Sequence, residues 1–142
     1  MVRLREAATL ALAMCLVGCD TATRMGEPVE LLTGVQPFDR ATCETYFAVD
    51  WMIVDPRYGT AVIDAHFNTA IPVMWRPGFT GRRSGSDVVV LDASGKVVAQ
   101  TGRGYRIQGT YWPPLGDTGP ASSTVWYACG SVEPSSTSAP TW

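Results

Sequence analysis

The sequence is poor in the residue types from which small enzymes build their sites. Histidine occurs once, at His66, so any serine nucleophile would depend on that one base. Ser84, in the stretch Gly81–Gly85, misses the spacing of a nucleophile elbow by one residue. Zinc needs three or four ligands and calcium needs alternating oxygen ligands, and neither pattern is present. We therefore expect no catalytic residue, no cofactor and no metal site, and we interpret His66 as a half-buried structural residue.

Two weaker catalytic patterns are also incomplete. Asp50, Asp55 and Asp64 lie on or near a predicted hairpin, where two carboxylates can approach each other as they do in glycosidases. Asp55 precedes a proline in a turn, however, and alternation along the strand puts Asp50 on the wetter face, so turn and edge roles are favoured. The stretch 102–104 has two glycines but lacks the third glycine of a dinucleotide-binding motif.

Positive charge and helical periodicity are scarce as well. The chain has 11 basic and 13 acidic residues, and its formal net charge is −2. Without residues 1–18 the charge is about −3, which gives no electrostatic support for general binding to nucleic acid or to anionic lipid. Beyond residue 18 there is no helical stripe longer than a few turns and no internal repeat. The mature domain is therefore expected to be built from strands.

What the sequence does have is a distinctive start. Arg3 and Arg5 precede the apolar run Ala7–Val17, which is too short to span a bilayer. The stretch Leu16-Val17-Gly18-Cys19 that ends this run resembles the lipobox of bacterial lipoproteins. The resemblance implies that residues 1–18 are a signal peptide, that Cys19 receives a lipid, and that the protein is extracytoplasmic and anchored to the cell membrane. An ordinary secretory signal with Cys19 near the cut, or a marginal buried helix, are the alternatives.

The four cysteines divide between this start and the rest of the chain. Cys15 lies in the predicted leader and Cys19 in the lipidation position, which leaves Cys43 and Cys129. In an oxidising compartment these two predict a disulfide that closes a loop of about 85 residues. In the chain-entropy model such a loop contributes roughly 4 to 5 kcal/mol. A metal pair is the competing interpretation, but it lacks further ligands.

The remaining residues are enough for one domain with one modest core. Residues 19–28 are short and polar and predict a tether, and residues 29–130 predict the folded domain. Residues 131–142 are rich in Ser, Thr and Pro, and we expect them to be a disordered tail because they offer almost no apolar area.

Within the domain, short runs of β-branched and aromatic residues are separated by Gly and Pro at spacings of about ten residues. They predict strands over Val29–Val35, Thr45–Val54, Thr60–Phe67, Ala70–Trp75, Val88–Leu91, Lys96–Ala99, Tyr105–Tyr111 and Thr124–Ala128. Between them, Arg76–Asp87 and Trp112–Ser123 predict exposed loops. In Thr45–Val54 the positions of Phe47, Val49, Trp51 and Ile53 make one face drier than the other. The fold class that follows is all-β, a small antiparallel barrel or a sandwich.

The clearest local signal lies between Val88–Leu91 and Lys96–Ala99. Asp92 can accept backbone hydrogen bonds at the first turn position, and Gly95 can adopt the left-handed conformation that closes a type I turn with a bulge. A tight hairpin is therefore expected here.

The order of these turns and strands from Val73 to Gly109 carries a second resemblance. Trp75-x-Pro77-Gly78, the run Val88–Leu91, and the turn Asp92-x-x-Gly95 resemble small uncharacterised lipoproteins of high-GC Gram-positive bacteria. The folded part of these proteins is similar to a five-stranded oligonucleotide/oligosaccharide-binding (OB) barrel. The resemblance covers about forty residues and implies a barrel and an envelope location. It carries over no catalytic residue.

Aromatic and arginine side chains gather in the two predicted loops. Such combinations suit sugar rings, carboxylates or nucleobases, and barrel rims are common ligand sites. The candidate ligand-binding residues are Trp75, Arg76, Phe79, Arg82, Arg83 and Trp112. The sequence thus favours a non-catalytic envelope lipoprotein that binds a protein partner. A carbohydrate or small-ligand binding module is the alternative, and an enzyme is the least supported.

Overall fold

The computed structural model describes residues 26–34, 43, 47–113 and 122–141. The predicted signal peptide, Cys19, residues 19–25 of the tether and most of the loop Trp112–Ser123 lie outside the described residues. Within these ranges, no helix is long and apolar enough to cross a membrane.

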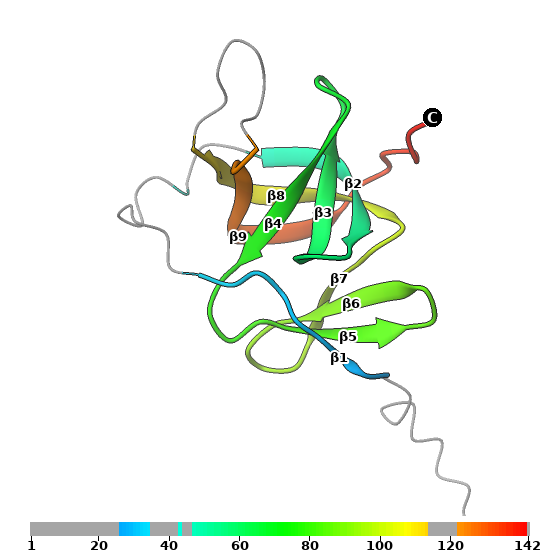
Figure 1. Ribbon diagram of the computed structural model, residues 1–142, viewed down its shortest axis with the longest axis vertical. Coiled ribbons are helices and arrows are strands. Elements are labelled where there is room, and N and C mark those ends of the chain that lie inside the picture. The colour runs from blue at the N-terminus through cyan, green and yellow to red at the C-terminus, as the bar shows by residue number, and fades with distance from the viewer. Residues whose placement is uncertain (1–25, 35–42, 44–46, 114–121, 142) are drawn as a thin grey trace, which may run out of the picture.

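The described residues form an all-β structure, as predicted (Figure 1). Its strands are β1 (Pro28–Val29), β2 (Phe47–Asp55), β3 (Gly59–Asp64), β4 (Thr69–Trp75), β5 (Thr80–Ser84), β6 (Asp87–Leu91), β7 (Val97–Gln100), β8 (Arg103–Trp112) and β9 (Val125–Pro134).

Five of these strands close a barrel, which decides between the two predicted architectures. The strand order is β2-β3-β4-β9-β8, and β8 pairs with β2 to complete the ring. All of these pairs are antiparallel except β4 with β9. This order, with its one parallel pair, is an OB-like connectivity. The predicted barrel is thus confirmed, and its one parallel pair arises because closure brings β9 alongside β4 in the same direction.

The segment between β4 and β8, together with β1, builds a second sheet with the order β1-β5-β6-β7. Its strand β5 corrects the prediction that Arg76–Asp87 is an exposed loop. Thr80–Ser84 is a polar run without strand alternation, but its backbone pairs with β1 on one side and β6 on the other. Gly81 fits there because a Cβ would lie 2.7 Å from the carbonyl oxygen of Val29. Backbone pairing rather than side-chain burial therefore places this strand.

The hairpin of β6 and β7 is confirmed. The N–H of Gly95 donates to the carbonyl of Asp92 at 2.9 Å, and Gly95 has a φ of 84°. Oδ1 of Asp92 accepts hydrogen bonds from the N–H groups of Ser94 (2.9 Å) and Lys96 (3.0 Å). A register shift lies between Val90 and Leu91. Local turn chemistry thus fixes this part of the fold.

The inward face of β2 is the opposite of the one expected. Ala48, Asp50 and Met52 are buried, whereas Val49 is 48% exposed. Both faces of this strand carry apolar residues, so alternation gives the period but not which face points inward. Barrel closure makes that choice.

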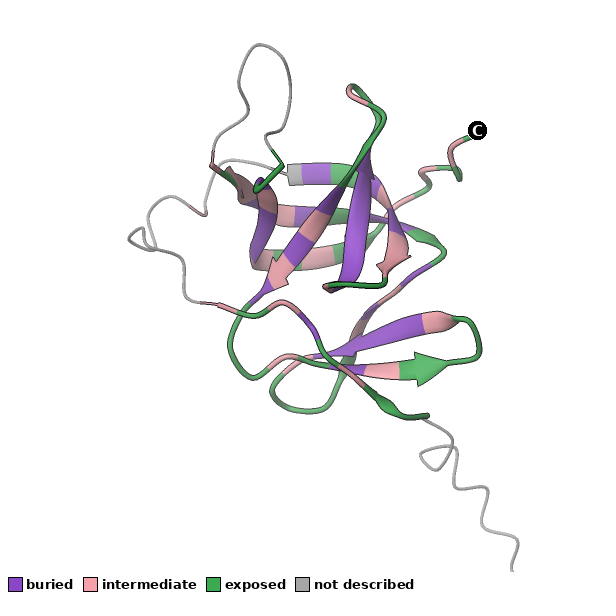
Figure 2. Ribbon diagram, in the orientation of Figure 1, coloured by how far each residue is buried: buried purple, intermediate pink, exposed green. Residues whose placement is uncertain are grey.

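One core extends through both sheets (Figure 2). Trp75 and Trp126 are the largest fully buried side chains in the barrel, and Val88, Val90 and Ala99 join the cluster from the second sheet. The two sheets therefore pack as one domain.

The last strand is longer than Thr124–Ala128. β9 pairs with β8 on both sides of a register shift and reaches Pro134, so the domain boundary predicted at residue 130 falls inside it. The next residue, Ser135, donates from its N–H to the carbonyl of Gly104 at 2.9 Å. Disorder from residue 131 onward was predicted from composition, which takes no account of pairing with β8.

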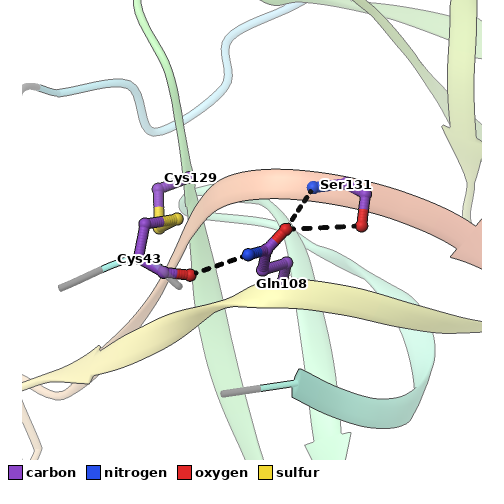
Figure 3. The surroundings of a disulfide bond; sticks show 4 residues. All are labelled: Cys43, Gln108, Cys129 and Ser131. Atoms are coloured by element: carbon purple, nitrogen blue, oxygen red, sulfur yellow. Dashed lines mark hydrogen bonds between the residues drawn. A yellow bond between two sulfur atoms is a disulfide. The ribbon is translucent and has the colours of Figure 1, made fainter. Parts of the chain in front are cut away.

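The Cys43–Cys129 disulfide is confirmed, with a Cα–Cα distance of 5.9 Å. Beside it, the side-chain amide of Gln108 links both segments (Figure 3). Its Nε2 donates to the carbonyl of Cys43 at 3.0 Å, and its Oε1 accepts from the N–H of Ser131 at 3.2 Å. The bridge fastens the chain before β2 to β9, and it indicates an oxidising, extracytoplasmic environment.

Candidate functional site

The first three predicted ligand-binding residues form one stack at the end of β4. Trp75 is fully buried, and its Nε1 donates to Oγ1 of Thr60 at 2.9 Å. Its ring stacks on Phe79 with centroids 5.7 Å apart, and the guanidinium of Arg76 lies 5.3 Å from the centre of the Phe79 ring. Trp75 therefore belongs to the core, and the Phe79 ring is already in contact with two neighbours.

The other three predicted residues belong to other elements. Arg82 and Arg83 lie on β5, where they pair with Val89 and Val88 of β6. Trp112 lies at the end of β8 in the barrel, opposite Val125. The structure thus distributes the six residues over the β4 stack, the second sheet and the barrel rather than gathering them into one site.

His66 is exposed in the turn between β3 and β4, not half-buried as predicted. Its N–H donates to Oδ1 of Asp64 at 2.9 Å, and its ring meets Phe67 edge to face at 4.6 Å. It remains exposed because the turn projects beyond the last pair of the hairpin, Asp64 with Thr69.

The barrel interior holds a pair of carboxylates that the sequence analysis assigned to turns and edges. Asp50 and Asp64 are only 8% and 7% exposed. Oδ1 of Asp64 accepts hydrogen bonds from the N–H groups of His66 and Phe67, and its Oδ2 accepts from the hydroxyl of Tyr111 at 2.7 Å. The interpretation of Asp50 as a residue of the wetter face was wrong, because that face is the inside of the barrel.

The electrostatics of this cluster favour protonated groups. Burial, followed by the neighbouring charge of Asp64, raises the pKa of Asp50 to about 6, against a smaller opposing effect of a hydrogen bond from the backbone of Ala65. Burial and the hydrogen bond to Asp64 raise the pKa of Tyr111 above its ordinary value. Tyr111 therefore stays a donor, and Asp50 takes up a proton in weakly acidic solution.

Two buried polar groups have spare hydrogen-bonding capacity. The Trp126 ring meets Tyr111 edge to face at 4.6 Å. Its Nε1 and the hydroxyl of Thr124 are buried and have no hydrogen-bond partner in the described structure. This part of the interior differs from the Trp75 stack, where the indole N–H is bonded. No group of three or more His, Cys, Asp or Glu among the described residues is arranged to hold a metal ion.

A different kind of site lies on the outside of the barrel. Trp51 pairs with Gly104 of β8 on one side and with Ile63 of β3 on the other, so these three residues form a row across neighbouring strands. A cavity of about 340 Å³ lies between the Trp51 and Gly104 end of this row and residues 134–138. A second cavity, of about 170 Å³, borders Trp51 and Ile63, and its other lining residues are Asp50, Ala65, Asn68, Thr137, Ser138 and Pro140. We refer to Gly104, Trp51 and Ile63 as the outer row.

No protein-family model matches the chain, no curated protein is significantly similar to it, and no solved structure matches it significantly.

Proposed function

We propose that this chain is a non-catalytic, lipid-anchored protein of the cell envelope whose barrel binds a protein partner through the outer row. The observation that carries the proposal is that a polypeptide segment, residues 135–140, already lies across this row in the free protein. The envelope location rests on the disulfide, which forms in oxidising compartments, and on the resemblance of Leu16–Cys19 to a lipobox.

The side chains that fill the barrel interior support a binding role for the outer row. Core side chains occupy the barrel interior, Asp64 is engaged there by hydrogen bonds, and Asp50 is only 8% exposed although it borders the second cavity. A catalytic acid or base must come within hydrogen-bond reach of its substrate. The outer row, in contrast, presents a tryptophan flanked by cavities, and aromatic side chains are enriched in protein interfaces.

The alternative, a carbohydrate or small-ligand module, depends on Trp112, which is 37% exposed, and on aromatic rings at the end of β4. There Trp75 is buried and the Phe79 ring is in contact with Trp75 and Arg76. A sugar ring needs an accessible aromatic face. The geometry at this position therefore favours a protein partner, and glycan binding becomes an outcome of the experiment below.

Photo-crosslinking in the native host tests the proposal with an internal control. A photoreactive residue replaces Val49, which is 48% exposed on β2 near the outer row, or Val97, which is 45% exposed on the second sheet. We expect one predominant protein adduct from position 49 and none from position 97. Equal adducts from both positions, or only glycan adducts, would overturn the proposal.

The anchor is tested separately. With Cys19→Ser we expect loss of metabolic lipid labelling and release of the protein from the membrane fraction. Unchanged labelling would contradict lipidation at Cys19 without affecting the crosslinking result.

A further inference from the structure

The segment after β9 crosses the outer row in a defined way. Because Trp51 is in register with both Gly104 and Ile63, the row runs across β8, β2 and β3. Ile63 alternates with the interior residues Val62 and Asp64, yet it is only 5% exposed. The second cavity, bounded by residues 137–140, lies over it. The segment, which continues from β9 and is drawn in red near the label C in Figure 1, therefore lies against the outer row.

The contact at Gly104 is made with the backbone of the segment. A Cβ at this position would lie 2.8 Å from the carbonyl oxygen of Thr137 and 3.2 Å from that of Ser135. The three nearest atoms all belong to the segment, and the N–H of Ser135 donates to the carbonyl of Gly104 at 2.9 Å. Gly104 thus allows a polypeptide backbone to approach the sheet closely, and this approach requires no particular large side chain.

The segment's own hydroxyl groups hold it in shape. The hydroxyls of Ser135 and Thr137 are 2.8 Å apart, and the N–H of Thr137 donates to Oγ of Ser135 at 3.2 Å. Such local bonds between Ser or Thr side chains and the backbone stabilise turns. Pro140 is half-buried beside the second cavity, whereas Ser136, Ser138 and Ala139 are exposed. Ser, Thr and Pro are therefore the residue types that this surface accepts.

The fit is incomplete, which makes the segment replaceable. Both cavities border Trp51, Thr137 and Ser138, so space remains on each side of the segment. A segment that also fills this space would bury more of the Trp51 side chain and would bind more tightly.

We infer that the outer row recognises a Ser/Thr/Pro-rich polypeptide of the partner, and that residues 135–140 occupy the same place in the free chain as a competing ligand in cis. This inference rests on the proposed function, since it names the partner's chemistry at that site. It predicts that partner binding and release of the segment are coupled.

The test uses the full-length chain and a fluorescent peptide with the sequence of residues 134–142. In one variant residues 135–140 are all replaced by glycine, which removes the hydroxyls that hold the segment. A second variant adds Gly104→Ala to this replacement. A peptide with alanine at every Ser and Thr is the ligand control.

We expect the peptide to bind the glycine-segment variant at least tenfold more tightly than the wild-type chain, by fluorescence anisotropy. Binding should be lost with Gly104→Ala and weakened for the alanine peptide. Because the nearest neighbours of a Cβ at position 104 all lie in the segment, Gly104→Ala should leave the barrel folded, which circular dichroism checks. Should the second variant not fold, Trp51→Ala in the glycine-segment background replaces it.

Equal affinity for the wild-type chain and the glycine-segment variant, or affinity unaffected by Gly104→Ala, would overturn the inference. If the peptide fails to bind while position 49 still crosslinks a protein, this inference is wrong and the proposed function stands. If crosslinking at position 49 fails, the proposed function is overturned as well.

Discussion

Apart from the long-range pair of β1 with β5, the second sheet is held together by pairings of shorter range than those that close the barrel. In the sheet, β5, β6 and β7 follow one another along the chain and pair through short turns. In the barrel, β2 pairs with β8 and β4 pairs with β9, across long intervening segments. Short-range pairs cost little loop-closure entropy, whereas the barrel needs compensation from its core and its disulfide. The outer row is possible only because β8, β2 and β3 are brought together by this long-range closure.

Removing the disulfide should have the largest effect on the barrel. In the double variant Cys43→Ser and Cys129→Ser, the unfolding free energy should fall by about 4 kcal/mol, because the closed loop of about 85 residues no longer restricts the unfolded chain. Urea unfolding of the variant and of the reduced wild-type protein should agree. A loss below about 1 kcal/mol would mean that the barrel is held by its core alone.

The next largest effect is expected at the Trp75 stack. Trp75→Phe removes the indole N–H that donates to Thr60 and leaves a cavity, and we expect a loss of about 2 to 3 kcal/mol in thermal or urea unfolding. Thr60→Val is the matched variant, since it keeps the ring and leaves the indole N–H unpaired. Strictly additive losses in the double variant would contradict a hydrogen bond between these side chains.

Replacement of the interior carboxylate Asp50 should raise the free energy of unfolding, whereas the two preceding changes lower it. Because Asp50 has a pKa of about 6 in the folded state against 3.8 ordinarily, its ionised form destabilises the fold above pH 6. The wild-type protein should recover this stability as the pH falls from 6 to 4. Asp50→Asn should therefore stabilise by about 1 to 2 kcal/mol at pH 8, and by almost nothing below pH 4.

Chemical unfolding at a series of pH values measures this difference. Asp55→Asn, at the turn end of the same strand, is the control and should give no stabilisation at pH 8. A gain for Asp50→Asn that does not change with pH would show that removal of the charge is not its cause.

The difference between short-range and long-range pairings also explains which features could be predicted from the sequence. The hairpin at Asp92 and Gly95 was found because its signal lies within four residues. Strand β5 was missed because nothing in Thr80–Ser84 reports the pairing of its backbone with β1. The disulfide was found because two cysteines remained once Cys15 and Cys19 had been assigned to the leader and its lipidation position.

The carboxylate pair lies between these cases. The turn after β2 pairs Asp55 with Gly59, and the same register continued along the hairpin places Asp50 opposite Asp64. Their proximity was therefore predictable from the turn. That both point inward was not, because β2 has apolar residues on both faces and only barrel closure selects one of them. The outer row was unpredictable for a similar reason, since it combines β8, β2 and β3 with the chain's last residues.

The smallest change in the free energy of unfolding is expected at the turn between β6 and β7, which is held by contacts between residues close together in the sequence. Gly95 has a φ of 84°, and a Cβ there would meet nothing within 4 Å. Gly95→Ala therefore tests backbone conformation without a steric clash, and we expect a loss of about 1 kcal/mol in urea unfolding. Gly95→Asn should lose less, because asparagine tolerates the left-handed region better than alanine. If Gly95→Ala lowered the free energy of unfolding as much as Trp75→Phe does, the hairpin would depend on its surroundings as strongly as the barrel does. The contrast between the two regions would then not hold.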